Sequence, residues 1–393
     1  MSASPASPTI ASQWVDPLIV TVAPNGAYKQ PADHSAVPIT PATLATTAKA
    51  CLDAGAAMLH MHIRDAQGRH SLDVEGYREA QRVVRQAVGD AMVIQITSEA
   101  AGVYQAPAQI AMVEALQPEA VSIGLREVDK PEIGEAGLQR FFTGLAQRRT
   151  MVQVILYDVA DLRRWQALRA SGVVPDAPWF LLFVLGRYSA GQTSSPRDLL
   201  PFLNAHDSNE PWAVCAFGAA ENACVAAAAV FGGHARVGFE NNLLCKDGSV
   251  APDNAALVRQ AVEAAQALGR PLAAAADIRK RFGALLNLSV VVHVLLEIEV
   301  VLLGVRRLGD ELAVDGLQHF PHHGLDHRQQ VLGRVARHVF HAWLEQAQGV
   351  AQLGSPQEIQ LFGRLFHLFA EFRGLRLALL FGGVLGQGFG QRG

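Results

Sequence analysis

Two histidines stand two residues apart in the apolar run of residues 58–64, at His60 and His62. Side chains alternate between the two faces of a β-strand, so in a strand both imidazoles point to the same side. Two imidazoles that project together from a strand end supply half of a typical zinc site. A pair of hydrogen-bonded structural histidines is the alternative. We favour metal binding because Arg64 and Asp65 follow the pair directly.

A further ligand must come from elsewhere in the chain, because catalytic zinc sites typically use three protein ligands. Glu240 is the best candidate, since it ends the apolar run 235–239. Arg236 lies four residues earlier, so on one strand the two side chains would share the inner face. An arginine beside a metal carboxylate suits an anionic substrate or a developing oxyanion. The alternative for Glu240 is a charged residue that opens a loop.

The elements that must position these residues alternate between strand and helix patterns from residue 16 to about residue 268. The expected strands cover residues 18–23, 57–64, 91–97, 120–124, 151–157, 179–185, 212–217 and 235–240. A helical pattern follows each strand, and eight such pairs in about 250 residues are typical of a (β/α)8 TIM barrel. The competing fold is a doubly wound open sheet, but no strand leads into a G-x-G-x-x-G turn or a P-loop.

In such a barrel the chemistry lies at the carboxyl ends of the strands. Besides the residues already named, this rule selects Thr97, Ser98, Glu99 and Ser122. It disfavours the remaining histidines of this segment, which fall in loops, in a turn or before the last strand, and which we expect to be non-catalytic. They are His34, His70, His206 and His234.

Four segments of the chain resemble the β-keto acid cleavage enzyme family, whose type member cleaves 3-keto-5-aminohexanoate. The segments are residues 32–40, 60–65, 183–186 and 232–242, within a likeness that covers roughly residues 16–283. The resemblance implies a zinc-dependent (β/α)8 enzyme, usually a homotetramer. It also implies that the enzyme condenses a β-keto acid with acetyl-CoA and releases acetoacetate and a new acyl-CoA.

The resemblance assigns roles to individual positions of this chain. Zinc ligation falls on His60, His62 and Glu240, the catalytic arginine on Arg236, and the substrate-binding hydroxyls on Thr97 or Ser98 and on Ser122. A metal that chelates the keto and carboxylate oxygens would acidify the α-carbon of the substrate. Arg236 would offset charge on the carboxylate or on a tetrahedral oxyanion.

The chain departs from the type member at two candidate substrate-binding positions and at one turn. Tyr28 replaces an acidic residue that is tied to the amino group of the type member's substrate. Asn241 replaces an aspartate that takes part in proton transfer, and an amide cannot act as a base. Proton transfer would then fall to the substrate carboxylate, a water or Glu99. The turn at residues 97–102 also differs, so we expect a different pocket shape.

The composition excludes several classes of protein. The formal net charge of −3, without a basic stripe, argues against nucleic-acid binding. The four cysteines lack paired metal-ligand spacing and read as reduced thiols of a cytoplasmic protein. No uninterrupted apolar run is long enough to predict a membrane span.

The two ends of the chain differ from the barrel segment at residues 15–283. Residues 1–14 read as a disordered leader and not as a signal peptide. Every Lys, Thr, Tyr, Met and Cys lies before residue 284. Residues 284–393 therefore form a C-terminal extension of biased composition, as after a frameshift, for which we expect poor order or loosely packed helices.

Two other functions remain open at this point. A zinc hydrolase of the amidohydrolase type also carries His-x-His in a barrel. That class places the pair on strand 1 and needs histidines on strands 5 and 6, and residues 151–157 and 179–185 have none. The second open function is a non-catalytic barrel whose site is disrupted by the C-terminal extension. Metal content and product formation separate it from an enzyme.

Overall fold

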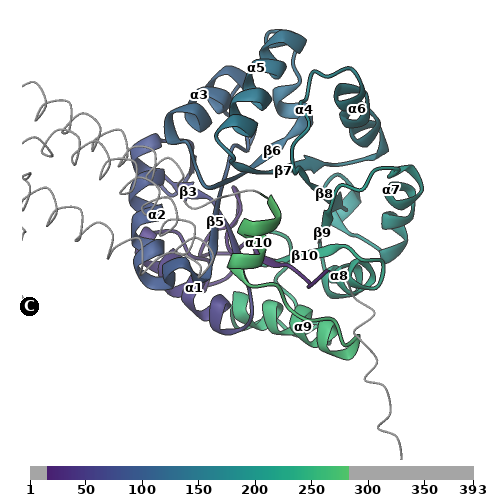
Figure 1. Cartoon of the computed structure of the whole chain (residues 1–393). Coiled ribbons are helices and arrows are strands. Elements are labelled where there is room, and N and C mark those ends of the chain that lie inside the picture. Colours follow the sequence, from purple (N-terminus) through teal and green to yellow (C-terminus); the bar gives the residue numbers. More distant parts are fainter. Residues whose placement is uncertain (1–15, 283–393) are drawn as a thin grey trace, which may run out of the picture. The chain divides into compact units, whose positions relative to one another are not determined.

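The structure is a computed structural model that describes residues 16–282 of the 393-residue chain (Figure 1). The expected leader at residues 1–14 and the extension at residues 284–393 lie outside the described residues. Within these bounds, eight strands close into a barrel in the order β1-β10-β9-β8-β7-β6-β5-β2. All of these pairings are parallel, and helices surround the barrel. The predicted (β/α)8 TIM barrel is confirmed.

The elements follow the predicted rhythm with small shifts at their ends. The barrel strands are β1 (Val20–Val22), β2 (Met58–Met61), β5 (Val93–Thr97), β6 (Ala120–Gly124), β7 (Met151–Leu156), β8 (Phe180–Leu185), β9 (Trp212–Ala216) and β10 (His234–Val237). The helices are α1 (Pro41–Asp53), α2 (Val74–Val88), α3 (Ala106–Leu116), α4 (Leu125–Val128), α5 (Gly134–Gln147), α6 (Val159–Ala170), α7 (Leu200–Ala205), α8 (Glu221–Val230), α9 (Asn254–Ala267) and α10 (Ala275–Phe282).

Side-chain caps fix where several helices begin. Thr40 accepts a hydrogen bond from the backbone of Thr43 and precedes Pro41, so α1 starts where the sequence predicts. Asp73 caps α2 and Asp158 caps α6 in the same way. These caps satisfy backbone N–H groups that the first turn of a helix leaves without partners.

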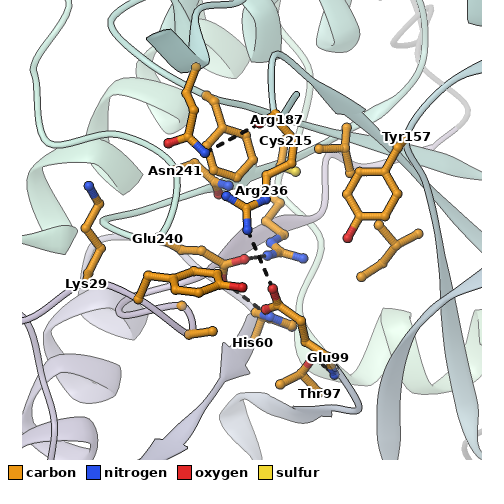
Figure 2. A pocket seen from close by; sticks show the side chains of 17 residues that line it. Lys29, His60, Thr97, Glu99, Tyr157, Arg187, Cys215, Arg236, Glu240 and Asn241 are labelled. Atoms are coloured by element: carbon orange, nitrogen blue, oxygen red, sulfur yellow. Dashed lines mark hydrogen bonds and ion pairs between the residues drawn. The ribbon is translucent and has the colours of Figure 1, made fainter. Parts of the chain in front are cut away.

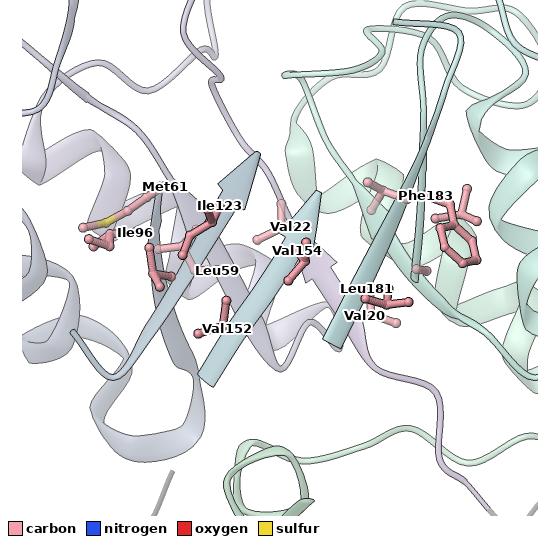
Figure 3. Packing of buried hydrophobic residues seen from close by; sticks show 14 of the residues in the cluster. Val20, Val22, Leu59, Met61, Ile96, Ile123, Val152, Val154, Leu181 and Phe183 are labelled. Atoms are coloured by element: carbon pink, nitrogen blue, oxygen red, sulfur yellow. The ribbon is translucent and has the colours of Figure 1, made fainter. Parts of the chain in front are cut away.

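The strand residues divide by period 2 into two buried sets. One set points outward against the helices, as Leu59, Met61 and Val154 do (Figure 3). The other set points into the barrel, where Met58 and Phe180 belong to a separate apolar cluster that extends from the amino-terminal ends of the strands to Ile155 and Val184 at the cavity. Alternation along each strand therefore builds two cores from one chain.

Helix α10 packs against the inner cluster, over the centre of the ring of strands (Figure 1). Its Ile278 and Phe282 are buried, and the ring of Phe282 lies 4.9 Å from that of Phe180. Further along the barrel axis, the inward positions become polar. They are Thr21, His60, Gln95, Ser122, Gln153 and Arg236. The barrel thus has an apolar end closed by α10, whereas polar side chains appear inside it toward the carboxyl ends of the strands.

Two expected strands end three residues earlier than predicted, and both ends carry site residues. Strand β2 stops at Met61, and β3 (Ile63–Arg64) pairs with β4 (His70–Ser71) in a separate antiparallel hairpin. Strand β10 stops at Val237, because Gly238 adopts a φ of +137° that turns the chain. Glu240 therefore lies in a turn. It pairs with Arg236 as expected, but the turn and not strand alternation brings the two side chains together.

Candidate metal centre

His60, His62 and Glu240 bring one ligand atom each to a common point (Figure 2 shows two of them). The Nε2 atoms of the two histidines lie 3.0 Å apart, and Oε2 of Glu240 lies 3.4 Å from each. Ligand atoms about 2.1 Å from a tetrahedral zinc ion stand about 3.4 Å from one another. The Oε2 atom is also buried without a hydrogen-bond partner. The spacing and the unpartnered oxygen both fit a divalent metal.

Gln95 orients His60 from inside the barrel. Its Oε1 lies 2.8 Å from Nδ1 of His60, and its Nε2 lies 3.5 Å from Oε1 of Gln153. An amide oxygen only accepts, so Nδ1 carries the proton and Nε2 keeps its lone pair for a metal. Burial, helped by the charge of Arg236, holds the pKa of His60 well below its usual range. The imidazole is therefore neutral, as a ligand must be.

A parallel relay orients His62 through His70. Nε2 of His70 donates to the carbonyl oxygen of Glu99 at 2.8 Å, which leaves Nδ1 of His70 as an acceptor. That Nδ1 lies 3.4 Å from Nδ1 of His62. His62 must then donate from Nδ1 and present its Nε2 lone pair to the metal. Burial lowers the pKa of His70 to about 3, which keeps this ring neutral. His70 thus contacts the candidate metal-binding residue His62, although the sequence analysis expects His70 to lie in a turn and to be non-catalytic.

The turn after β10 holds Glu240 in place. Glu221, buried at the start of α8, accepts from the backbone N–H of Gly238 at 3.1 Å and from Nδ2 of Asn242 at 3.3 Å. Burial raises the pKa of this carboxyl to about 8. The guanidinium of Arg236 forms an ion pair with Glu240. Burial opposes ionisation of Glu240, but the charge of Arg236 outweighs it and holds the pKa of Glu240 well below the usual range.

The loop after β1 packs directly on Glu240. Gly26 adopts a φ of +58°, and a Cβ atom at this position would lie 2.5 Å from Cγ of Glu240. The guanidinium of Arg64 donates to the carbonyls of four residues of this loop. Those residues are Asn25, Gly26, Ala27 and Lys29. The Arg64 that follows the histidine pair therefore shapes the site and does not itself line it.

A cavity of about 240 Å³ opens beside the three ligands (Figure 2). Of the predicted site residues, it is lined by Tyr28, His60, Thr97, Glu99, Arg236, Glu240 and Asn241. The buried Nε and Nη1 atoms of Arg236 have no hydrogen-bond partner. The side-chain amide nitrogen and oxygen of Asn241 also have none. Such unpartnered polar atoms are costly unless a ligand satisfies them.

Ser98 and Ser122, which the sequence offers as substrate-binding hydroxyls, do not line this cavity. Ser98 donates to the carbonyl oxygen of Ser122 at 3.1 Å. The hydroxyl of Ser122 lies 3.2 Å from that of Thr97, which does reach the cavity. The two serines therefore support Thr97 from behind. His62 likewise lies behind the cavity wall, fully buried.

Glu99 stands between the ligands and the outer part of the cavity. Its Oε2 lies 3.7 Å from Nε2 of His62, and its Oε1 lies 3.9 Å from Nη2 of Arg187. Burial, together with the nearby charge of Glu240, raises the pKa of Glu99. The side chain is thus close enough to the ligands to exchange a proton with a bound molecule.

Several residues around the site are not predicted from the sequence, among them Gln95, Arg187, His70 and Glu221. Gln95 has the inward parity of Thr97 on the same strand, and Arg187 follows the end of β8, so the barrel rule could have flagged both. His70 and Glu221 give no such signal, because only the folded chain brings His70 to His62 and Glu221 to the turn that carries Glu240.

Comparisons with known proteins agree on one family. A sequence model of the beta-keto acid cleavage enzyme family matches residues 17–284. The 3-keto-5-aminohexanoate cleavage enzyme of Fusobacterium nucleatum subsp. nucleatum is 27% identical over 276 residues, which cover 68% of this chain and 97% of the relative. The 3-oxoadipate:acetyl-CoA acetyltransferase of Cupriavidus necator is 25% identical over 276 residues, covering 68% and 95%.

The solved structures resemble the barrel more distantly. The apo structure of ObcA aligns with a TM-score of 0.51 and 15% identity over 63% of this chain. The alignment covers 65% of the ObcA chain, just under two thirds of its length. At this level of identity the likeness concerns the fold alone.

Proposed function

The chain belongs to the beta-keto acid cleavage enzyme family, and we propose that it transfers the acyl group of a β-keto acid to coenzyme A. In this reaction R–CO–CH2–COO⁻ and CH3–CO–SCoA give CH3–CO–CH2–COO⁻ and R–CO–SCoA. The enzyme is then an acyl-CoA-forming C-acyltransferase that releases acetoacetate. The name of the Cupriavidus necator relative, an acetyl-CoA acetyltransferase, supports acetyl-CoA as the co-substrate.

The observation that carries this proposal is the convergence of His60, His62 and Glu240 beside the buried Arg236. We propose that the three residues hold Zn²⁺. When bound, the metal supplies the Lewis acidity that makes the α-carbon of a keto acid acidic enough to lose a proton. Two neutral imidazoles and one carboxylate are a donor set that zinc accepts in catalytic sites.

Arg236 has the central role among the other residues. Its Nε and Nη1 atoms are buried and unpartnered, so they can donate to the substrate carboxylate and to the oxyanion that forms at the attacked carbonyl. Placing these donors in a buried site strengthens them, because water does not compete.

The remaining lining residues have separate roles in the proposal. Glu99 transfers the proton of the α-carbon, since Asn241 stands next to Glu240 and its amide cannot. Asn241 and the hydroxyl of Thr97 hydrogen-bond the substrate, with Ser98 and Ser122 holding Thr97. Tyr28 lies over the outer part of the cavity and contacts the substrate side chain.

The hydrolase alternative finds no support in the barrel. His60 lies on β2 and His62 directly after it, and neither β7 nor β8 carries a histidine, whereas an amidohydrolase-type site needs ligands there. Among the described residues, His60, His62 and Glu240 form the one cluster of three or more His, Cys, Asp or Glu side chains with metal-ligand spacing.

We propose a cytoplasmic homotetramer as the working form, as the family resemblance implies. The four cysteines carry free thiols, which fits a reducing compartment. No helix within residues 16–282 is long and apolar enough to cross a membrane. Light scattering on the purified protein measures the mass and tests the tetramer directly.

The experiment that tests the function combines metal analysis with product detection. Purified protein should contain about one zinc per chain and should form acetoacetate and a new acyl-CoA from acetyl-CoA and a β-keto acid. The substitution His60→Ala should remove both the zinc and the products. His206→Ala is the matched control, because His206 bonds the carbonyl of Glu210 far from the ligands. A zinc-loaded protein that forms no product from any β-keto acid would defeat the proposal.

A further inference from the structure

Arg187 occupies the outer part of the cavity and is already held by three partners. Its guanidinium carbon lies 5.2 Å from the ring of Tyr28 and 5.2 Å from the ring of Phe217. Its Nη2 lies 3.9 Å from Oε1 of Glu99 (Figure 2). A cation over an aromatic face within about 6 Å is attracted by the ring, so both rings stabilise this position.

These three partners are the groups that a positively charged substrate would need. Of the two carboxylates that line the cavity, Glu240 is paired with Arg236 and directed at the histidines. Glu99 is the second, and Arg187 faces it. The aromatic faces of Tyr28 and Phe217 could surround a quaternary ammonium, but the guanidinium lies against both.

Part of the cavity wall near Arg187 is apolar. Ile155 and Val184 line it together with Phe217, each from a different strand end or the loop after it. These side chains offer contact to hydrocarbon and no partner for a charge. A substrate side chain that reaches these three residues therefore meets apolar atoms, while Arg187 and Lys29 both add positive charge to the cavity lining.

We propose that Arg187 determines specificity by restricting the enzyme to β-keto acids whose side chain carries no positive charge. The inference rests on the proposed function, because it concerns the side chain R of the same substrate. A cationic side chain must either displace Arg187 from Glu99 and the two rings or stand beside it unpaired. An uncharged side chain of the same shape pays neither penalty, and it packs on the apolar wall.

A matched pair of substrates tests the proposal. One β-keto acid carries a trimethylammonium group at the end of its side chain, and the other carries a tert-butyl group of the same shape. Wild-type enzyme should use the tert-butyl compound with a kcat/KM at least tenfold higher. The substitution Arg187→Met should shift this ratio at least tenfold toward the cation, because Glu99 and both rings become available to it. Arg187→Lys should keep the wild-type preference, since it keeps the charge.

The outcomes separate this inference from the proposed function. Wild-type enzyme that uses the cationic compound as well as its neutral isostere would overturn the inference, as would an Arg187→Met ratio equal to that of wild type. If neither compound yields acyl-CoA, calorimetric titration of each compound into the zinc-loaded protein replaces kcat/KM. Binding that favours the tert-butyl compound in wild type, but not in Arg187→Met, would then support the inference while the proposed reaction fails.

Discussion

At the scale of single residues, the two histidines depend on partners that hold their protons in place. Gln95 accepts from Nδ1 of His60, and His70 accepts from Nδ1 of His62. The hydrogen bonds behind His60 end at the amide oxygen of Gln95, and those behind His62 end at the backbone carbonyl of Glu99. Both of these oxygens can only accept. Because the rings are therefore set in the metal-binding tautomer before any metal arrives, binding needs little rearrangement.

The substitution Gln95→Leu should weaken zinc binding by about 10- to 100-fold, the usual cost of losing a partner behind a metal-bound histidine. Leucine fills a similar volume but cannot accept from Nδ1, so His60 loses its preferred tautomer and orientation. Competition with a chelator of known affinity measures the change. Gln153→Leu is the control, because Gln153 lies in the same polar region and touches Gln95 without touching a histidine. If Gln95→Leu and Gln153→Leu bind zinc equally well, the hydrogen bond between His60 and Gln95 does not control zinc affinity.

At the scale of elements, the site is assembled from turns just beyond the strands. Glu240 lies in the turn after β10, where Gly238 redirects the chain and Glu221 holds it from α8. The loop after β1 covers the other side of Glu240, with Arg64 fixing four of its carbonyls. The position of the carboxylate is therefore decided by two turns that pack on each other, and not by the strand itself.

The substitution Gly26→Ala should weaken zinc binding by at least tenfold. The new methyl group would stand 2.5 Å from Cγ of Glu240, so the ligand or the loop must move. Gly68→Ala is a matched control, because Gly68 also has a positive φ of +75° but its nearest neighbour, Oε1 of Gln30, is 3.5 Å away. Both variants should lose about 1 kcal/mol of unfolding free energy from the strained backbone. Only Gly26→Ala should change the metal affinity, and a zinc affinity unaltered by it would contradict the packing argument.

At the scale of the whole barrel, the sequence predicts repetition well and local turns poorly. Strand–helix alternation identifies the barrel, and the carboxyl-end rule then selects His60 and Glu240. Glu240 is found for a partly wrong reason, because the strand ends at Val237 and the bend at Gly238 is a property of the folded turn. The contacts of Arg187 could not be predicted at all, since its partners Tyr28 and Glu99 come from loops far apart in the chain. Periodicity cannot report such contacts, because they depend on the closed barrel.

The two ends of the described barrel have different tasks. The amino-terminal end is an apolar core that α10 closes with Ile278 and Phe282. The carboxyl-terminal end carries the cavity and the unpartnered polar atoms. In TIM barrels the first end serves stability and the second serves chemistry, so a change at one end should leave the other largely intact.

The substitution Phe282→Ala tests this division of labour. It should lower the free energy of unfolding by about 3–5 kcal/mol, because a buried aromatic ring leaves a cavity beside Phe180. Zinc affinity, measured where both proteins remain folded, should stay within a factor of about three of wild type, as expected for distant sites that share no partners. Phe217→Ala makes the same change at the other end, where the ring already borders the cavity. It should destabilise the fold less and weaken β-keto acid binding more. If Phe282→Ala reduces zinc affinity as strongly as stability, the barrel transmits strain along its axis and its two ends are not independent.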